Sequence, residues 1–316
     1  MDKGKGVLFA LMTALVSGTS VFVNGFAVKG FEPFSFVAVR NFAVVLFLVA
    51  AVMLVGQVQA LRSLNRKQWA LLALIGLIGG GIPFLLYFKG LAMVEGAARA
   101  SFLYRSLFIV SALIATVWLR EKITRNVMIG VALAMLGNVL LMGNAAWSVW
   151  GAGELLVLGA TVMWACEYVI AKKVMNEQEI SPRLLALGRM GFGALLLLVF
   201  TAFTGQLGAA ASYSAMQWEW VAISAAFLFA FVGFWYASLA NTTVTNATSA
   251  FVLGGPLTAV LSLAFVGTAL EPLSAAGLLL MAVGSAVVIG YSNFAGAFAF
   301  LKKSMSERMG AFAWKA

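Results

Sequence analysis

Residues 34–55 read FSFVAVRNFAVVLFLVAAVMLV, an apolar stretch that carries a single charged side chain, Arg40. At a rise of about 1.5 Å per residue, this stretch is long enough to cross the hydrocarbon core of a lipid bilayer. A cation at the centre of a membrane helix costs about 2.5–3.5 kcal/mol on insertion scales, so it normally faces a partner, a wet cavity or a substrate. The stretch therefore predicts a membrane helix beside a polar interior.

Similar stretches recur along the whole chain. Hydrophobic residues make up 63% of the 316 residues and charged residues only 10%, and the mean hydropathy is +1.00. The predicted spans are residues 6–27, 34–55, 68–90, 95–118, 124–143, 152–173, 183–204, 217–240, 244–267 and 272–292. Because these ten spans leave no room for a soluble domain, the sequence predicts an all-α integral membrane protein.

The distribution of charge indicates the orientation of the chain. The formal net charge is +10. If the N-terminus lies inside, cytoplasmic segments hold fifteen Lys and Arg residues and the outer side holds only Lys29 and Lys89. Cationic residues concentrate in cytoplasmic loops of membrane proteins. We therefore expect a multi-pass protein of the cell membrane with both termini in the cytoplasm, and we expect no nucleic-acid partner.

The sequence predicts neither a removable signal peptide nor a cofactor site. The first apolar run is too long for a removable signal peptide and lacks a clear small-residue cleavage site. Cys166 is the only cysteine and the chain has no histidine, so we expect no internal disulfide, no metal and no cofactor. Any coupling to protons would have to use a carboxylate or another group.

The chain is predicted to be a duplicated unit. Unusual residues of the two halves match at a constant offset along the chain, which increases by one residue after the third pair. The pairs are Arg40 and Arg189, Trp69 and Trp218, Tyr87 and Tyr236, Ala97 and Ala247, Ala100 and Ala250, and Glu121 and Glu271. Each unit holds five spans, so the second must enter the membrane upside down, as in many secondary transporters. We expect repeats at 1–146 and 147–292, followed by a cytoplasmic tail at 293–316 that resembles an interfacial amphipathic helix.

These residues also carry a family resemblance. The early arginine of the second helix, the alanine-spaced fourth helix and a Leu-x-Glu-x-x-Thr-like turn occur in both halves; the turn begins at Leu119 and, more loosely, at Leu270. In this order the chain resembles the EamA-type members of the drug/metabolite transporter superfamily, from Gly6 to Tyr291. The resemblance implies a ten-helix exporter or exchanger of small metabolites, often amino acids.

Arg105 is the leading candidate for substrate binding. The repeat alignment places it near the bilayer centre, opposite Gly254-Gly255-Pro256. Its guanidinium could hold a carboxylate or phosphate through paired hydrogen bonds. The alternative is a structural arginine that donates to backbone carbonyls. The other predicted substrate-binding residues are Ser101, Tyr104, Phe108, Trp164, Trp235, Gly254 and Gly255.

The other intramembrane charges receive different predictions. Glu167 and Arg189 lie at similar depths on consecutive spans, which favours a buried ion pair, although a proton-coupling role for Glu167 is the alternative. For Arg40 and Arg189 we expect anchoring of a helix to backbone or headgroups rather than substrate binding. Arg99 is predicted either to guard the entrance or to snorkel to the interface.

Helix breaks indicate where the protein bends. Proline removes a backbone donor and frees a carbonyl one turn earlier, and freed backbone at membrane depth is tolerated where it lines an enclosed cavity. Close helix packing on the glycines is the alternative. The predicted gate or hinge residues are Gly80, Pro83, Pro256 and Arg99.

Together these features favour a secondary transporter of small organic metabolites with an anionic group. We favour amino acids as the substrate, and a sugar-phosphate or nucleotide-sugar exchanger is the alternative. A lipid-acting enzyme or a scaffold is favoured less than either kind of transporter. No Walker-type loop appears in the sequence, so ATP-driven transport by this chain alone is not expected. The expected partners are a small-molecule substrate, the lipid bilayer and, as a candidate, protons.

Overall fold

The computed structural model describes residues 2–27, 30–94, 102–142, 151–267 and 271–313, and within these ranges every regular element is a helix. The helices are α1 (Lys3–Ala27), α2 (Pro33–Leu54), α3 (Val58–Arg62), α4 (Arg66–Ile75), η1 (Gly76–Gly81), α5 (Ile82–Met93), α7 (Leu107–Trp118), α8 (Arg125–Met142), α9 (Ala152–Gln178), α10 (Pro182–Phe203), η3 (Gln206–Ser212), α11 (Ala215–Asn241), α12 (Val244–Val252), α13 (Gly254–Val266), α14 (Pro272–Ile289) and α15 (Tyr291–Ala313).

The prediction of an all-α membrane protein is confirmed. Among the described residues, eight helical segments are long and apolar enough to cross a membrane. Two shorter apolar helices, Phe102–Trp118 and Arg125–Leu141, lie where the sequence predicts the fourth and fifth spans. The first part of the predicted fourth span, residues 95–101, is outside the described residues.

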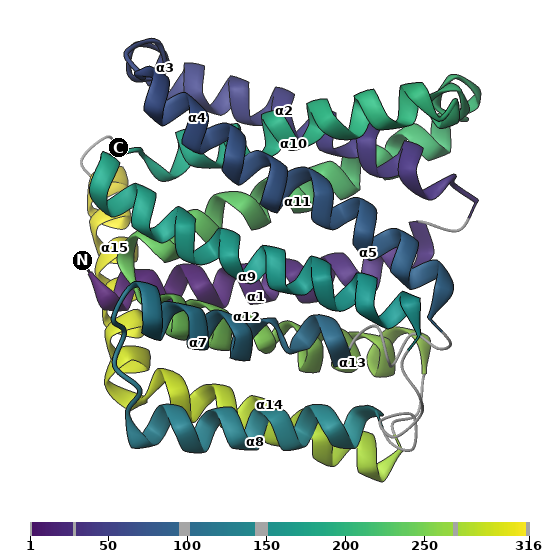
Figure 1. Ribbon diagram of the computed structural model, residues 1–316. Helices are drawn as coiled ribbons and strands as arrows, with labels where there is room; N and C mark the ends of the chain where they lie inside the picture. The colour runs from purple at the N-terminus through teal and green to yellow at the C-terminus, as the bar shows by residue number, and fades with distance from the viewer. Residues whose placement is uncertain (1, 28–29, 95–101, 143–150, 268–270, 314–316) are drawn as a thin grey trace.

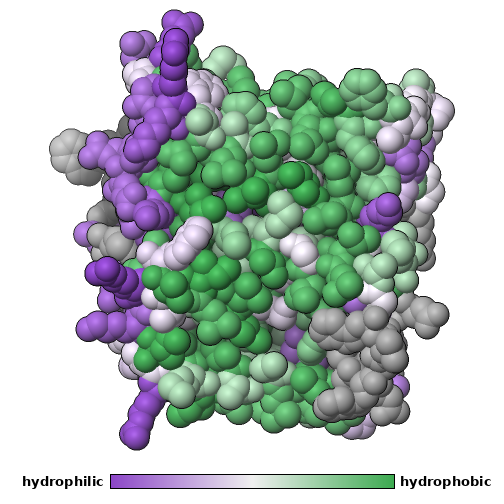
Figure 2. All heavy atoms as spheres, in the orientation of Figure 1, coloured by the Kyte–Doolittle hydropathy of each residue, from purple (hydrophilic) through white to green (hydrophobic). Residues whose placement is uncertain are grey.

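The spanning helices lie side by side, and the chain ends lie at the same edge of the bundle (Figure 1). Figure 2 shows apolar side chains over the middle of one face, with hydrophilic side chains concentrated at the edge that carries the termini. α15 runs across that edge, roughly perpendicular to the spans (Figure 1). Its Ala297 packs into a cluster with Val7 of α1, whereas the side chain of Phe298 is exposed; an interfacial amphipathic tail stays a prediction.

The packing of the helices follows the two-fold repeat. α1 packs on α11, and the equivalent pair from the opposite repeats, α9 and α5, pack on each other in the same way. α2 packs on its own counterpart, α10, and α8 packs on its own counterpart, α14. Glycines make the α8–α14 contact close: a Cβ at Gly130 would lie 2.5 Å from the Gly284 carbonyl oxygen, and one at Gly137 would lie 2.4 Å from that of Gly277. After the two glutamates, Gly130 and Gly137 have the same spacing as Gly277 and Gly284. The repeat therefore relates Gly130 to Gly277 and Gly137 to Gly284, and it exchanges these two contacts, as expected for inverted repeats.

Helix breaks occur at both glycine–proline stretches of the sequence, residues 79–83 in the third span and 254–256 in the ninth. In the third span, π-helical η1 separates α4 from α5, and Pro83 lies in the first turn of α5. In the ninth span, α12 ends at Val252 and α13 begins at Gly254. Each break therefore lies inside a span rather than at its end.

Candidate substrate-binding site

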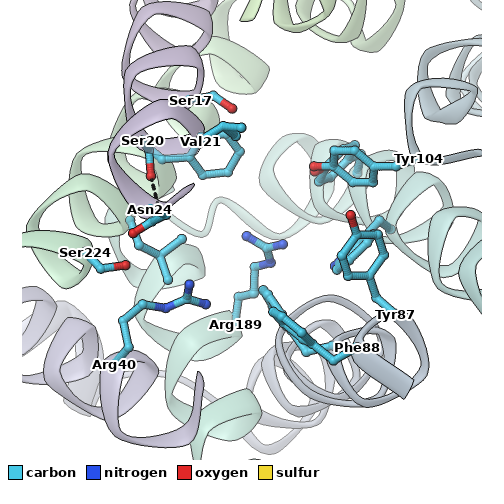
Figure 3. Close-up of a pocket in the computed structure, with 15 residues that line it drawn as sticks. Ser17, Ser20, Val21, Asn24, Arg40, Tyr87, Phe88, Tyr104, Arg189 and Ser224 are labelled. Carbon is cyan, nitrogen blue, oxygen red and sulfur yellow. Dashed lines mark hydrogen bonds between the residues drawn. The ribbon is translucent and has the colours of Figure 1, made fainter. Parts of the chain in front are cut away.

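A cavity of about 240 Å³ lies between helices of both repeats. Side chains of α1, α2, α5, α9, α10 and α11 contribute to its wall, together with Tyr104. The full lining consists of Ser17, Ser20, Val21, Asn24, Arg40, Phe84, Tyr87, Phe88, Tyr104, Trp164, Tyr168, Arg189, Ser224, Leu228 and Phe231. We call this the arginine cavity because two guanidinium groups point into it (Figure 3).

Arg40 and Arg189 are repeat equivalents that the tertiary structure brings to one cavity. Arg40 lies on α2 and Arg189 on α10, and these two helices pack against each other. The prediction that these arginines anchor a helix to backbone or headgroups stays a prediction, although Arg189 donates to a backbone carbonyl, that of Gly79; the structure adds that both arginines line the cavity.

Arg189 belongs to a buried polar network. Its Nε lies 3.6 Å from Oε2 of Glu167, whose side chain is 0% exposed, and its Nη2 donates to the Gly79 carbonyl oxygen at 3.1 Å. The Tyr236 hydroxyl donates to Oε1 of Glu167 at 2.5 Å, and Trp164 Nε1 donates to the same Gly79 carbonyl at 2.9 Å. The carboxylate thus neutralises the charge that Arg189 brings to the cavity.

Gly79 is required by the geometry of this network. A Cβ at this position would lie 2.5 Å from Cγ of Glu167, which is closer than two non-bonded carbon atoms can approach. The π-helical turn of η1 presents the Gly79 carbonyl to two donors, Trp164 and Arg189. The glycine run in the third span therefore positions the ion pair as well as interrupting the helix.

Arg40 has no such neutralising partner among the described residues. No described carboxylate lies within 4.0 Å of its guanidinium. Its Nε and Nη2 donate to the side-chain oxygen of Asn41 at 3.2 and 3.0 Å, and its guanidinium lies 5.6 Å from the ring centroid of Phe36 and 5.9 Å from that of Phe84. An amide and two ring faces orient the guanidinium but do not cancel its charge. Arg40 therefore makes the arginine cavity electropositive.

Two further polar groups face the same cavity. The side-chain oxygen of Asn24 and the hydroxyl oxygen of Ser224 are buried and have no hydrogen-bond partner among the described residues. Asn24 donates its amide to Ser20 Oγ at 3.0 Å, which leaves its oxygen as an acceptor. Buried polar atoms are normally satisfied. Figure 3 shows these groups on the same side as Arg40, across the cavity from Tyr87 and Tyr104.

Arg105 lines a second, adjoining cavity of about 560 Å³. Four of the predicted substrate-binding residues meet Arg105 there: Tyr104, Phe108, Gly254 and Gly255. A Cβ at Gly255 would overlap the Arg105 guanidinium, so a larger residue there would displace the guanidinium from this position. The two cavities share Ser17, Val21, Tyr87 and Tyr104 in their walls.

The two predicted tryptophans occupy different places. Trp164 lines the arginine cavity. Trp235 is 0% exposed and lines neither of these two cavities; its ring centroid lies 4.3 Å from that of Tyr168 and 6.0 Å from that of Phe251. The prediction that Trp235 contacts substrate is therefore not supported by its position, because it lies in the packed layer next to these lining residues.

The predicted gate residues are also placed by the structure where it describes them. Gly80 lies against α10, since a Cβ there would be 2.2 Å from the Arg189 carbonyl oxygen. Pro83 is buried in the first turn of α5, and Pro256 lies in the first turn of α13 beside the second cavity. Arg99 and Ser101 lie outside the described residues.

Sequence reasoning missed Arg40, Asn24 and Ser224 as residues of the site. For Arg40 a signal existed, because a charged side chain inside an apolar span normally faces a partner, a wet cavity or a substrate. For Asn24 and Ser224 we find no comparable signal. They are single polar residues in apolar spans, and only the packing of α1 and α11 brings them to one wall.

These features define a multi-pass membrane protein in which two inverted repeats surround a polar cavity. A family model described as the EamA-like transporter family matches residues 4–143 and again residues 151–290. The chain therefore belongs to the EamA-like transporter family, within the drug/metabolite transporter superfamily.

Comparison with solved structures supports the same fold. A structure titled only "Crystal structure of protein" aligns with a TM-score of 0.70 over 90% of this chain and 97% of that one, at 16% sequence identity. At this identity the likeness shows the fold alone. No curated protein matches the chain.

Proposed function

We propose that this protein is a secondary transporter of a small organic solute with an anionic group, which it moves by alternating access. The observation that carries the proposal is the guanidinium of Arg40, which faces the arginine cavity without a described carboxylate within 4.0 Å. A charge at this depth is costly unless it serves a ligand or a partner. Arg105 in the adjoining cavity gives the same preference for anions.

Within this class we favour amino acids. A carboxylate could pair with Arg40, and the acceptor oxygens of Asn24 and Ser224 could receive the hydrogens of an ammonium group. The aromatic wall opposite, which includes Tyr87 and Phe88, suits an apolar side chain (Figure 3). A cavity of about 240 Å³ is smaller than most ligand sites, which occupy roughly 300–1,000 Å³, so it favours a small solute.

A sugar-phosphate or nucleotide-sugar exchanger is the second candidate. It is favoured by the second cation, Arg105, in a cavity of about 560 Å³ that adjoins the first. A larger phosphorylated solute could occupy both cavities and contact two guanidinium groups, which bind phosphate well. Such a solute would have to pass the shared aromatic residues Tyr87 and Tyr104.

Transport fits the described residues better than lipid chemistry does. Glu167 is held by Tyr236 and Arg189, so we propose that it forms a static pair rather than acting as a catalytic acid or a proton carrier.

Combined with the charge bias of the loops, the fold is consistent with a cell-membrane transporter whose termini both lie in the cytoplasm.

Flux into reconstituted vesicles tests this proposal through Arg40. A thermal-shift screen of L-amino acids and sugar phosphates on the purified protein first selects the solute. Arg40→Gln should then weaken the apparent affinity for that solute about 10- to 100-fold, because a hydrogen bond to a charged group contributes about 1.5–3 kcal/mol. Arg40→Lys should retain more activity because it keeps the charge.

Arg125→Gln, at the start of α8 and outside both cavities, is the matched control and should leave flux unchanged. Wild-type flux in Arg40→Gln would overturn the assignment of this site. If neither solute class moves through the wild-type protein, the proposed substrate class is wrong.

A further inference from the structure

A cavity of about 500 Å³ lies away from the proposed substrate site, between α1, α2, α10 and α11. It shares no lining residue with the arginine cavity or with the cavity around Arg105. We call it the basic groove. Its lining consists of Lys5, Phe9, Leu48, Ala51, Pro182, Arg183, Ala186, Phe229, Ala230, Gly233, Phe234, Ala237 and Asn241.

The chemistry of the basic groove changes with depth. Its polar lining residues all lie at the ends of their helices: Lys5 in the first turn of α1, Arg183 in the first turn of α10 and Asn241 at the last residue of α11. The helix ends belong to the edge that carries both termini (Figure 1). Farther along α11 the lining is apolar, with Phe234, Gly233 and Phe229.

The rim of the groove is built to attract an anion. The side-chain nitrogens of Lys5 and Arg183 have no carboxylate oxygen within 4.0 Å in the described part of the chain, and the described lining contains no acidic residue. The N-termini of α1 and α10 lie at the same rim, but the Asp2 carboxylate already caps α1, because its Oδ1 accepts from the backbone N–H of Lys5 at 3.1 Å. The two side-chain cations therefore favour a negative group at headgroup level.

The deeper part of the groove opens toward the surrounding lipid. Gly233 is exposed although it lies inside a spanning helix, and a Cβ built on it meets no atom within 4 Å. It is eight residues from the end of α11, which corresponds to a depth of about 12 Å at 1.5 Å per residue. At that depth a neighbouring acyl chain can enter the groove from the side.

We infer that the basic groove binds one anionic phospholipid, with its phosphate at Lys5 and Arg183 and an acyl chain along Phe234, Gly233 and Phe229. A soluble metabolite would meet the polar rim but would gain nothing from the apolar length below it. A zwitterionic lipid would fill the apolar length but would present no net charge to the rim. Basic pockets between membrane helices recognise anionic headgroups in this way.

Lipid binding to the detergent-purified full chain tests the inference. The probes are phosphatidylglycerol and phosphatidylcholine with identical acyl chains, measured by native mass spectrometry and by the shift in Tm. Wild-type protein should prefer phosphatidylglycerol. The double variant Lys5→Gln/Arg183→Gln should bind it about 10- to 30-fold more weakly, because each cation near the headgroup contributes about 1 kcal/mol, and should lose the preference over phosphatidylcholine.

Matched controls separate the groove from general surface charge. Arg66→Gln/Lys67→Gln removes two exposed cations from the start of α4, outside the groove, and should keep the preference. Gly233→Leu should weaken the retention of both lipids by filling the apolar part, whereas Gly191→Leu, at a glycine of α10 with equally open space, should not. Gly233→Ala serves if the larger variant fails to fold.

Three results would overturn the inference. The first is a wild-type preference for phosphatidylglycerol in Lys5→Gln/Arg183→Gln. The second is an equal loss of preference in Arg66→Gln/Lys67→Gln, which would show nonspecific attraction. The third is a Tm shift from soluble glycerol phosphate as large as that from phosphatidylglycerol, which would show an anion site with no role for the acyl chain.

Discussion

Two arginines at equivalent positions of the repeat have different electrostatic surroundings. Arg189 is paired with Glu167, which is itself held by the Tyr236 hydroxyl. Arg40 is oriented by Asn41 and by aromatic rings, and no described carboxylate lies within 4.0 Å of it. The repeat therefore supplies two cations, and Glu167, which belongs to none of the matched pairs, decides which of them is available to an anion.

The Glu167–Arg189 pair should contribute strongly to stability. Glu167→Ala should lower the free energy of unfolding by about 3–5 kcal/mol, because removal of one partner leaves a buried charge uncompensated. Glu177→Ala on the same helix is the control: Glu177 is 58% exposed and lies 3.8 Å from Lys173, so its loss should cost less than about 1 kcal/mol. Chemical denaturation in detergent measures both, and equal effects would show that the buried pair has no special role.

At the scale of helices, contacts between glycines determine how closely the two repeats approach. η1 packs on α10, and a Cβ at Gly193 would lie 2.4 Å from the backbone carbon of Gly80. The α8–α14 pair uses the same device at Gly130 and Gly284. Small residues allow helices to approach closely in membranes, where hydrophobic burial does not drive association.

Replacement of one glycine by alanine tests the η1–α10 contact. Gly193→Ala should destabilise the protein by about 1–3 kcal/mol, because overpacking forces the backbones apart. Gly191→Ala, two residues away on α10 and with nothing within 4 Å of its Cβ, should be neutral or stabilise by up to about 1 kcal/mol, since alanine has the higher helix propensity. Thermal unfolding of the two purified variants compares them. A neutral Gly193→Ala would mean that α10 can move away from η1 without cost.

At the scale of the whole molecule, the fold places the chain ends at one edge and gives that edge most of the hydrophilic side chains visible in Figure 2. Because cationic loops are retained in the cytoplasm, we expect this edge to face inward. The opposite edge, with the 3₁₀ helix η3, should then face outward.

Labelling of single cysteines in intact cells tests this orientation. The background is Cys166→Ser, which removes the only cysteine and should be unlabelled. Ser212→Cys, exposed at the end of η3, should react with a membrane-impermeant maleimide. Ser63→Cys, exposed after α3, should react only after the membrane is permeabilised. The opposite pattern would invert the proposed topology.

Much of the architecture was predictable because hydropathy is a local property. Apolar length predicts the spans, the matching residues of the two halves predict the repeat, and the glycine–proline stretches predict where two spans are interrupted. The depths of Glu167 and Arg189 placed them close enough to pair. Trp235 shows the limit of this reasoning, because an aromatic residue in a span can line a cavity or pack next to its wall at the same depth.

The sequence by itself determined the spans, the bias of charge and the inverted duplication, since each depends on composition and order along the chain. Only the tertiary structure decided that Arg40 and Arg189 share a cavity with Asn24 and Ser224. The physical reason is that depth in the bilayer follows from position in a span, whereas the direction of a side chain follows from helix rotation. Rotation is set by close packing between helices that are distant in sequence, such as α2 with α10 and α1 with α11.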